Sequence, residues 1–171
     1  MPEEFLDIVD EEDNITGNTT RKNVREKFLL HRVATIIIIN NKGEFLTLKR
    51  SKSKDIFPGY WGLGVAETVK SGENYEEAAA RGLNEEIGYP TSTMELKHAF
   101  QFNLKYRSGK HNVNYKVFKV FCNAELNLQR EEVEEGKFIS KDEIKKLIEA
   151  ENFHPGSAQI FYNYIKNKQL E

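Results

Sequence analysis

The run from Val33 to Ile39 constrains the fold more than any other part of the chain. It reads Val-Ala-Thr-Ile-Ile-Ile-Ile, and nearly all of these residues are β-branched. Such side chains favour strands, and an uninterrupted apolar run suits the core of a sheet rather than an exposed edge. The chain is therefore expected to build its domain around a sheet that contains this strand.

The remaining segments predict one domain over residues 1–171, since no repeat or Pro/Gly-rich linker divides the chain. A return strand at 44–49 follows a turn at 41–43, which predicts a hairpin with the central strand. This order of elements indicates an α/β or α+β sandwich with helices on the faces of the sheet. Further strands are expected at 4–9, 60–65, 96–106, 112–122 and 137–139, turns at 10–18 and 108–109, and helices at 74–87, 140–150 and 157–168.

Composition narrows the classes of partner. The 171 residues carry a net charge of -2, so nothing favours bulk attraction to nucleic acid or to a membrane surface. Cys122 is the single cysteine, which excludes an intrachain disulfide and a cysteine-based zinc cluster. The acidic start has no secretory pattern, and no apolar run could span a bilayer. A cytoplasmic protein without nucleic-acid or membrane partners is expected.

The helix at 74–87 carries the residues that suggest chemistry. Asn74 and Glu77 form a capping-box pattern at its start, and Gly88 is placed to end it. Arg81 and Glu85 lie four residues apart and share a face. Hard cations such as Mg²⁺ are bound by carboxylate oxygens together with water and substrate phosphate. The acidic residues could supply that shell, or they could simply form a solvated face; they are Glu73, Glu85 and Glu86.

The same segment resembles the Nudix box, Gly-x5-Glu-x7-Arg-Glu-U-x-Glu-Glu-x-Gly-U, where U is aliphatic. The resemblance implies the Nudix fold, a mixed β-sheet sandwiched between helices, and a Mg²⁺ or Mn²⁺ site that handles diphosphates. It implies catalytic roles for Arg81, Glu85 and Glu86, with Glu73, Glu85 and Glu86 as metal ligands. The matching positions are Glu73, Arg81, Leu83, Glu85, Glu86 and Gly88.

Three positions depart from the box. Glu67 stands where the box begins with glycine, Gly82 where it has the Glu after the arginine, and Tyr89 at the final aliphatic position. In the family the replaced Glu commonly binds metal or acts as general base. One hypothesis is that Glu67 compensates as a metal ligand, because the box places its loop beside the metal. The alternative is a weakened or inactive site, and the general base is left unassigned.

Segments outside the box resemble the isopentenyl-diphosphate isomerase-like branch, notably Phe57-Pro58-Gly59-Tyr60-Trp61. There, Arg50 and Lys54 match positions that bind substrate phosphates, and Trp61 is expected to wall the pocket. His31 matches an isomerase metal ligand, or is a structural histidine. Isomerase chemistry itself is not expected: Ala66 and Thr68 replace a catalytic cysteine and a metal-binding histidine, a second histidine position falls near Val24, and residues 111–116 contain no acid.

These features favour a divalent-metal-dependent hydrolase that cleaves a diphosphate linkage in a nucleotide derivative or similar small molecule. The alternative is a catalytically weakened Nudix domain that binds a phosphorylated ligand. Isomerase-like chemistry is the third and least favoured reading. The last helix packs on the sheet or forms a homodimer contact; the sequence leaves both open.

Overall fold

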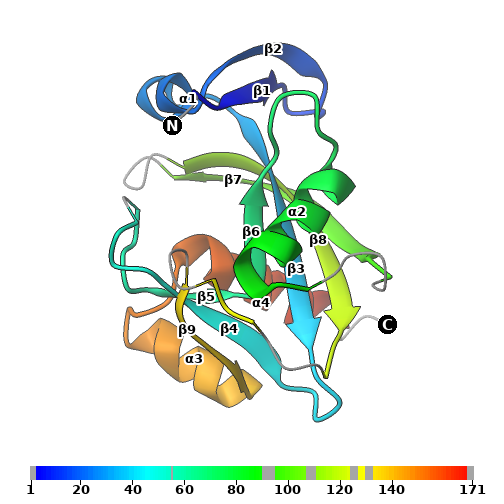
Figure 1. Ribbon diagram of the computed structural model, residues 1–171, viewed down its shortest axis with the longest axis vertical. Coiled ribbons are helices and arrows are strands. Elements are labelled where there is room, and N and C mark those ends of the chain that lie inside the picture. The colour runs from blue at the N-terminus through cyan, green and yellow to red at the C-terminus, as the bar shows by residue number, and fades with distance from the viewer. Residues whose placement is uncertain are drawn as a thin grey trace.

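A computed structural model describes residues 3–54, 56–89, 95–106, 111–123, 127–129 and 133–168. Within them a nine-stranded mixed sheet lies between helices, with α2 on one face and α3 and α4 on the other (Figure 1). This confirms the expected α+β fold. The elements are β1 (Phe5–Val9), β2 (Ile15–Thr20), α1 (Arg21–Lys27), β3 (His31–Ile39), β4 (Phe45–Arg50), β5 (Trp61–Leu63), β6 (Val65–Thr68), α2 (Tyr75–Ile87), β7 (Lys97–Tyr106), β8 (His111–Phe121), β9 (Val133–Ile139), α3 (Lys141–Glu149) and α4 (Pro155–Lys168).

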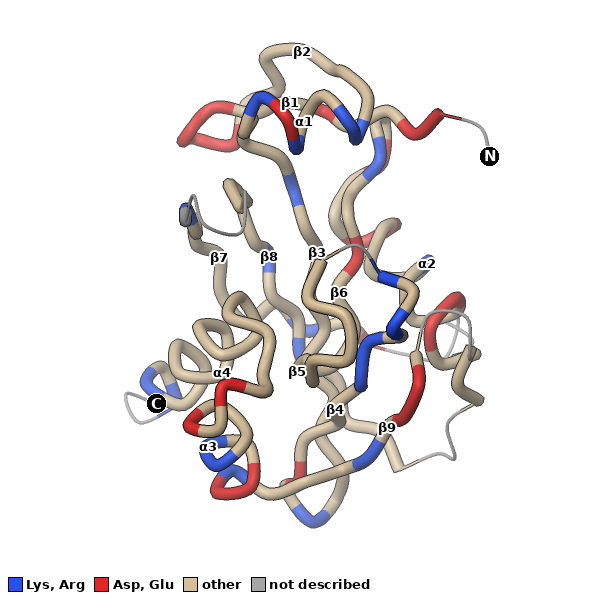
Figure 2. The backbone as a smooth tube through the Cα atoms, turned by 90° about the vertical axis from the view of Figure 1, so that its left-hand side faces the viewer, with Lys and Arg blue, Asp and Glu red and all other residues tan. Residues whose placement is uncertain are grey.

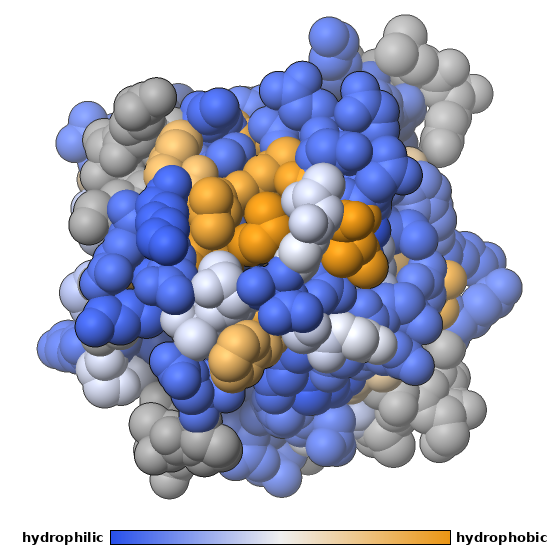
Figure 3. Space-filling view, turned by 90° about the horizontal axis from the view of Figure 1, so that it is seen from above, coloured by the Kyte–Doolittle hydropathy of each residue, from blue (hydrophilic) through white to orange (hydrophobic). Residues whose placement is uncertain are grey.

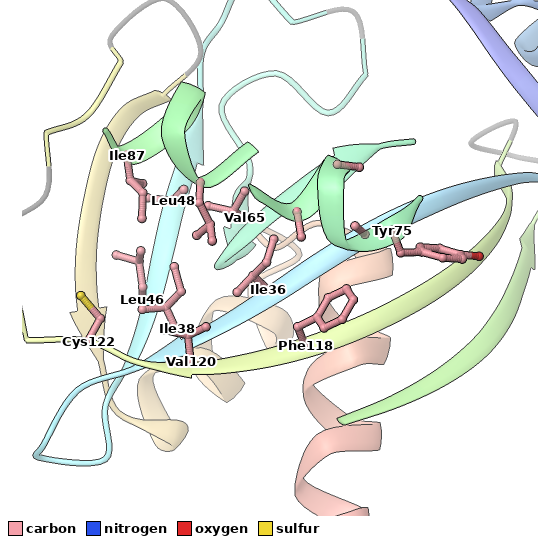
Figure 4. Close-up of a cluster of buried hydrophobic side chains, with 14 of the residues drawn as sticks. Ile36, Ile38, Leu46, Leu48, Val65, Tyr75, Ile87, Phe118, Val120 and Cys122 are labelled. Atoms are coloured by element: carbon pink, nitrogen blue, oxygen red, sulfur yellow. The ribbon is translucent and has the colours of Figure 1, made fainter. Parts of the chain in front are cut away.

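The β-branched run forms the central strand β3, and its two faces build two cores. Ala34, Ile36 and Ile38 point toward α2, where they meet side chains such as Val65 and Phe118 (Figure 4). The alternate residues Val33, Ile37 and Ile39 pack against α3 and α4. Successive side chains of a strand point to opposite faces, so an uninterrupted apolar run requires a covered sheet.

The predicted hairpin between β3 and β4 is confirmed at its turn, but the antiparallel pairing is short. Gly43 has a φ of 74°, and the Asn40 side chain accepts hydrogen bonds from the backbone of the turn. Ile39 and Phe45 are the one pair of residues that the two strands share. Along residues 33–36 the same edge of β3 is taken by β6, so β4 turns away to pair with β5 and β9.

The expected strand at 60–65 is divided at Gly64. This glycine has a φ of 58°, and a Cβ atom there would lie 1.9 Å from the Ile36 carbonyl oxygen. The chain therefore passes from the edge of β4 to the edge of β3 through a bend that only glycine fits, because it has no Cβ atom. Because of this bend, β6 runs beside α2 and carries Ala66 and Glu67 to the helix that holds the box.

The N-terminal layer differs from the expectation of one long turn at 10–18. A turn at 10–14 leads into β2, and α1 follows with Thr20 as its N-cap. Val24 is the buried residue of α1, so the short helix had no apolar periodicity to reveal it. Seen from above this layer, apolar side chains gather near the centre of the face and hydrophilic ones surround them (Figure 3). Exposed apolar residues of the layer include Phe5 and Ile15.

The other expected elements agree with the structure to within a few residues. Ser140 caps α3 through a capping box with Glu143, α4 begins two residues early at Pro155, and β9 begins four residues early at Val133. The expected turn at 108–109 lies outside the described residues. No helix of the described part of the chain is long and apolar enough to cross a membrane.

Candidate active-site cleft

Helix α2 forms as its sequence predicts. The Asn74 side chain accepts a hydrogen bond from the backbone N–H of Glu77 at 2.8 Å, and the Glu77 carboxylate accepts one from that of Asn74 at 2.9 Å. Gly88 ends the helix in the left-handed conformation. The buried stripe includes Ala79 and Leu83, so the polar stripe carries Arg81 and the acidic residues away from the core.

Arg81 is the centre of an ion-pair network. Its Nε and Nη2 atoms donate to the two carboxylate oxygens of Glu73, at 2.9 and 2.8 Å. Nη2 also donates to the Thr68 carbonyl oxygen at 2.9 Å, and Nη1 lies 3.0 Å from Glu67 and 3.5 Å from Glu85. These bonds lower the pKa of Glu73 and raise that of Arg81. Both carboxylate oxygens of Glu73 are therefore occupied by hydrogen bonds from Arg81.

Gly82 and Glu67 face each other across the contact between α2 and β6. A Cβ atom at Gly82 would lie 2.9 Å from the Cβ of Glu67 and 3.1 Å from a methyl group of Val65. A side chain at position 82 would therefore force the helix and the strand apart. The Glu67 side chain is 16% exposed; burial raises its pKa, and Arg81 opposes that shift. Two departures from the box thus meet at one point in space.

Carboxylates and cations line the outer part of a cleft beside this contact, with a volume of about 460 Å³. Arg50 and Lys54 lie there with Glu67, Glu85 and Glu86, so the structure brings the expected phosphate-binding and acidic residues together. The Arg50 Nε atom donates to the Ile56 carbonyl oxygen at 3.1 Å, which orients its guanidinium. In Figure 2 the basic stretch after β4 lies below the N-terminal layer and beside the acidic strand β9.

The donor atoms fit a divalent ion that shares its shell with substrate. Among the described residues, no three acidic, histidine or cysteine side chains converge into a ready-made cage. Three carboxylates nevertheless line the outer cleft: Glu67, Glu85 and Glu86. Mg²⁺ is typically held by one or two carboxylates plus water and phosphate oxygens, so an open arrangement of this kind suits it.

Three cations of the outer cleft were missed by the sequence analysis: Arg21, Arg25 and Lys70. Arg21 and Arg25 come from α1 and line the cleft opposite α2. Arg21 is anchored by Glu4 at 2.7 Å and donates to the Thr68 hydroxyl at 3.1 Å. The available signal was Thr20, a good N-cap, followed by two arginines four residues apart, which share one helix face.

The cleft continues into an inner pocket of about 180 Å³. The two parts share a wall that includes Arg50, Ala66 and Glu86. Beyond this wall the polar side chains of the lining are His31, Thr68, His111, Tyr115, His154 and Ser157. Burial lowers the pKa of His31 and His111 to about 4 and that of His154 to about 3, so all three imidazoles are neutral at pH 7.

Trp61, which was expected to wall the pocket, lies outside the cleft. Trp61 is 5% exposed and packs in the core on the α4 side, with the Lys137 ammonium 4.4 Å above its ring. It is not among the described residues that line either part of the cleft. His31 does line the inner pocket, and its Nδ1 atom lies 3.2 Å from the Leu29 carbonyl oxygen. That bond fixes the orientation of the ring, as it would for a structural histidine or a ligand.

The described positions that match the catalytic cysteine and the catalytic acids of an isomerase carry other groups. Ala66 lines both parts of the cleft with a methyl group, and the Thr68 hydroxyl is occupied by Arg21. On β8 the side chains of His111 and Tyr115 face the inner pocket, and neither is an acid that could stay ionised beside an allylic substrate.

Comparisons with known proteins agree with this architecture. The NUDIX domain family model matches residues 29–164. An uncharacterized Nudix hydrolase of Pseudomonas aeruginosa is 32% identical over 95% of this chain and 94% of its own length. An isopentenyl-diphosphate Delta-isomerase of Photorhabdus laumondii is 29% identical over 96% and 92%.

Solved structures show the same fold. A crystal structure from Deinococcus radiodurans has a TM-score of 0.81 and 22% identity, covering 94% of this chain and 99% of that one. The NUDIX domain of Shewanella oneidensis NrtR, solved with ADP ribose, has a TM-score of 0.63 and 14% identity, covering 82% and 88%. The family match over most of its length, together with the helix and cleft described above, establishes that this chain belongs to the Nudix domain family.

Proposed function

We propose that the protein is a hydrolase that cleaves a diphosphate linkage in a nucleotide derivative or similar small molecule, using Mg²⁺ or Mn²⁺. The observation that carries this proposal is the meeting of opposite charges in the outer cleft. Arg50 and Lys54 face carboxylates of β6 and α2 there, so a diphosphate can bind cations on one side and a shared metal on the other. The ADP ribose held by the NrtR domain supports a ligand of this class.

The metal is assigned to Glu85, Glu86 and Glu67. When bound, such an ion neutralises the charge of the diphosphate and activates water. Glu73 was expected among the ligands, but both of its oxygens are bonded to Arg81. We therefore assign Glu73 and Arg81 to positioning: they hold Glu67 and Glu85 at one edge of the cleft.

Glu67 takes over the place of the carboxylate that the box has at position 82. The side chain arises from β6 rather than α2, and Gly82 leaves the space that it needs. Its link to Arg81 at 3.0 Å keeps it beside Glu85. The carboxylate has thus moved from one side of the helix–strand contact to the other, while the local charge is preserved.

A weakened domain that binds a phosphorylated ligand is the alternative. The observation that favours it is the engagement of Glu67 and Glu73 by Arg81, which restrains two of the acidic groups of the segment. The same cleft would then bind a diphosphate without cleaving it. Cations from α1, β4 and the loop after β4 serve either activity.

The test is release of phosphate-containing product from nucleoside diphosphate derivatives, nucleoside triphosphates and prenyl diphosphates, with Mg²⁺ or Mn²⁺. Turnover should depend on metal and fall at least about 100-fold in Glu86→Gln and Glu67→Gln, because charge-stabilising groups of an active site contribute about that much. Glu149→Gln, on the exposed face of α3, is the matched control and should be unchanged. Tight ligand binding without turnover would instead establish the binding domain.

A further inference from the structure

The inner pocket and the outer cleft differ in what they offer a ligand. The outer cleft is lined by ten ionisable side chains, including Lys54 and Glu85. The inner pocket carries its charges on the shared wall, and its deeper lining consists of neutral imidazoles, a phenol, the hydroxyl side chains of Thr68 and Ser157, and aliphatic groups. A molecule that fills both parts must therefore be charged at one end and uncharged at the other.

His154 presents a hydrogen-bond donor of fixed orientation to this pocket. Its Nδ1 atom accepts hydrogen bonds from the backbone N–H groups of Gly156, at 3.2 Å, and Ser157, at 3.4 Å. A ring nitrogen that accepts cannot carry the proton, so the neutral ring bears it on Nε2. No described residue accepts a hydrogen bond from this Nε2 atom. The Phe57 ring packs edge-on against the His154 ring, with 4.8 Å between the two ring centroids, and holds it in place.

The neighbours of His154 form a second polar group. The Tyr115 hydroxyl lies 2.5 Å from the Nε2 atom of His111, whose ring centroid is 5.9 Å from that of His154. Gly156 permits this approach, because a Cβ atom there would lie 2.6 Å from the Tyr115 hydroxyl oxygen. Strand β8 and the start of α4 are thus packed closely enough to place two imidazoles and a phenol around one pocket.

This lining discriminates between kinds of organic group. An aliphatic chain would cover the His154 donor without satisfying it, and a buried unsatisfied donor is costly. A further phosphate would exchange water for neutral groups, which is also unfavourable. An uncharged polar ring with a hydrogen-bond acceptor satisfies the donor and packs against the aliphatic wall, which includes Val113 and Ile160.

We propose that the inner pocket receives the organic part of the diphosphate substrate, that this part is an uncharged ring carrying a hydrogen-bond acceptor, as a nucleobase does, and that His154 determines specificity for it. The inference rests on the proposed function, because the outer cleft must hold the diphosphate for the ring to reach the pocket. It goes beyond that function by naming the part of the substrate that is recognised and the residue that recognises it.

The experiment compares equilibrium binding of α,β-methylene nucleoside diphosphates with that of methylenediphosphonate, which lacks the organic part, in the presence of Mg²⁺. In the wild type at least one nucleoside analogue should bind more tightly than methylenediphosphonate. His154→Phe should weaken that analogue about tenfold or more, since it removes one donor, and leave methylenediphosphonate within about twofold. His154→Gln keeps an N–H donor and should retain much of the selectivity.

Two results would overturn the inference while leaving the proposed function intact. One is equal weakening of both probes by His154→Phe, which would mean that the residue acts on the fold. The other is that no nucleoside analogue binds better than methylenediphosphonate. Lys54→Gln separates the two proposals: it should weaken both probes, and its failure to weaken either would overturn the assignment of the outer cleft itself.

Discussion

The two parts of the cleft differ in the charge state of their partly buried ionisable groups. In the outer part, the charge of Arg81 is balanced by ion pairs with Glu67, Glu73 and Glu85. In the inner part, burial removes the charge of His111 and His154, whose pKa values are about 4 and about 3. Pairing preserves a field that can act on phosphate, whereas neutralisation leaves a pocket that selects by shape and hydrogen bonding.

The largest expected effect is the loss of free energy of unfolding when the ion-pair network around Arg81 is broken. Arg81→Met removes the cation from Glu67 and Glu73, whose side chains are 16% and 23% exposed. Removing one partner of a partly buried network typically costs about 3–5 kcal/mol, because the remaining charges stay desolvated. Urea denaturation at pH 7 measures the loss of free energy of unfolding. A loss below about 1 kcal/mol would show that the network is effectively solvated.

The neutral histidines of the inner pocket should make the free energy of unfolding depend on pH. The pKa of each buried histidine lies below the value of about 6.5 in the unfolded chain, so acid protonates the unfolded state first. Stability should therefore be complete above about pH 6.5 and fall as the pH drops toward 4, by up to about 1.4 kcal/mol per pH unit for each histidine. Carboxylates titrate toward the acid end of this window, and their contribution cancels when the wild type is compared with a variant that lacks one histidine.

Denaturation curves between pH 7 and 4.5 test this dependence. His154→Phe should lose about one histidine's share of the slope, whereas Ser157→Ala, beside it in the pocket, removes no titrating group and should keep the slope. An unchanged slope in His154→Phe would mean that this imidazole is protonated in the folded protein, and the contrast between the two parts would then disappear.

Local patterns were sufficient for the elements whose signals lie close together in sequence. Strand β3 was indicated by its own β-branched run, and α2 by its capping box and buried stripe. The box spacing also placed Arg81, Glu85 and Glu86 on one helix. These features depend on interactions within a few residues, which a sequence displays directly.

The parts that were missed depend on contacts between distant segments. Trp61 is an aromatic beside an expected phosphate site, but its burial against α4 is decided by the docking of that helix. The inner pocket joins His111 on β8 to His154 before α4, and no sequence pattern relates these positions. Helix α1 is short and has one buried residue, so it owes its position to the N-terminal layer.

The role of Glu73 was also beyond sequence reasoning. Its place in the box marks it as part of the acidic set, but its orientation is decided by Arg81 and by the Lys70 backbone N–H, which donates to it at 3.0 Å. The departure of Glu67 from the box suggested it as a metal ligand. The reason for Gly82 lies in a tertiary contact, because a Cβ atom there would collide with the Cβ of Glu67. The spacing of the box indicated which residues belong to the acidic set, whereas the partner of each carboxylate is decided by tertiary packing.

The central claim is that Glu67 and Gly82 form one complementary pair, and a double-mutant cycle on Mn²⁺ affinity tests it most directly. Glu67→Gly removes the relocated carboxylate, and Gly82→Glu forces a side chain into contact with the Cβ of Glu67. Each single change should weaken Mn²⁺ binding about tenfold or more, and the double variant should recover to within a few-fold of the wild type, because it restores one carboxylate to the available space. A double variant no better than the weaker single variant, or single variants that bind Mn²⁺ normally, would contradict the account.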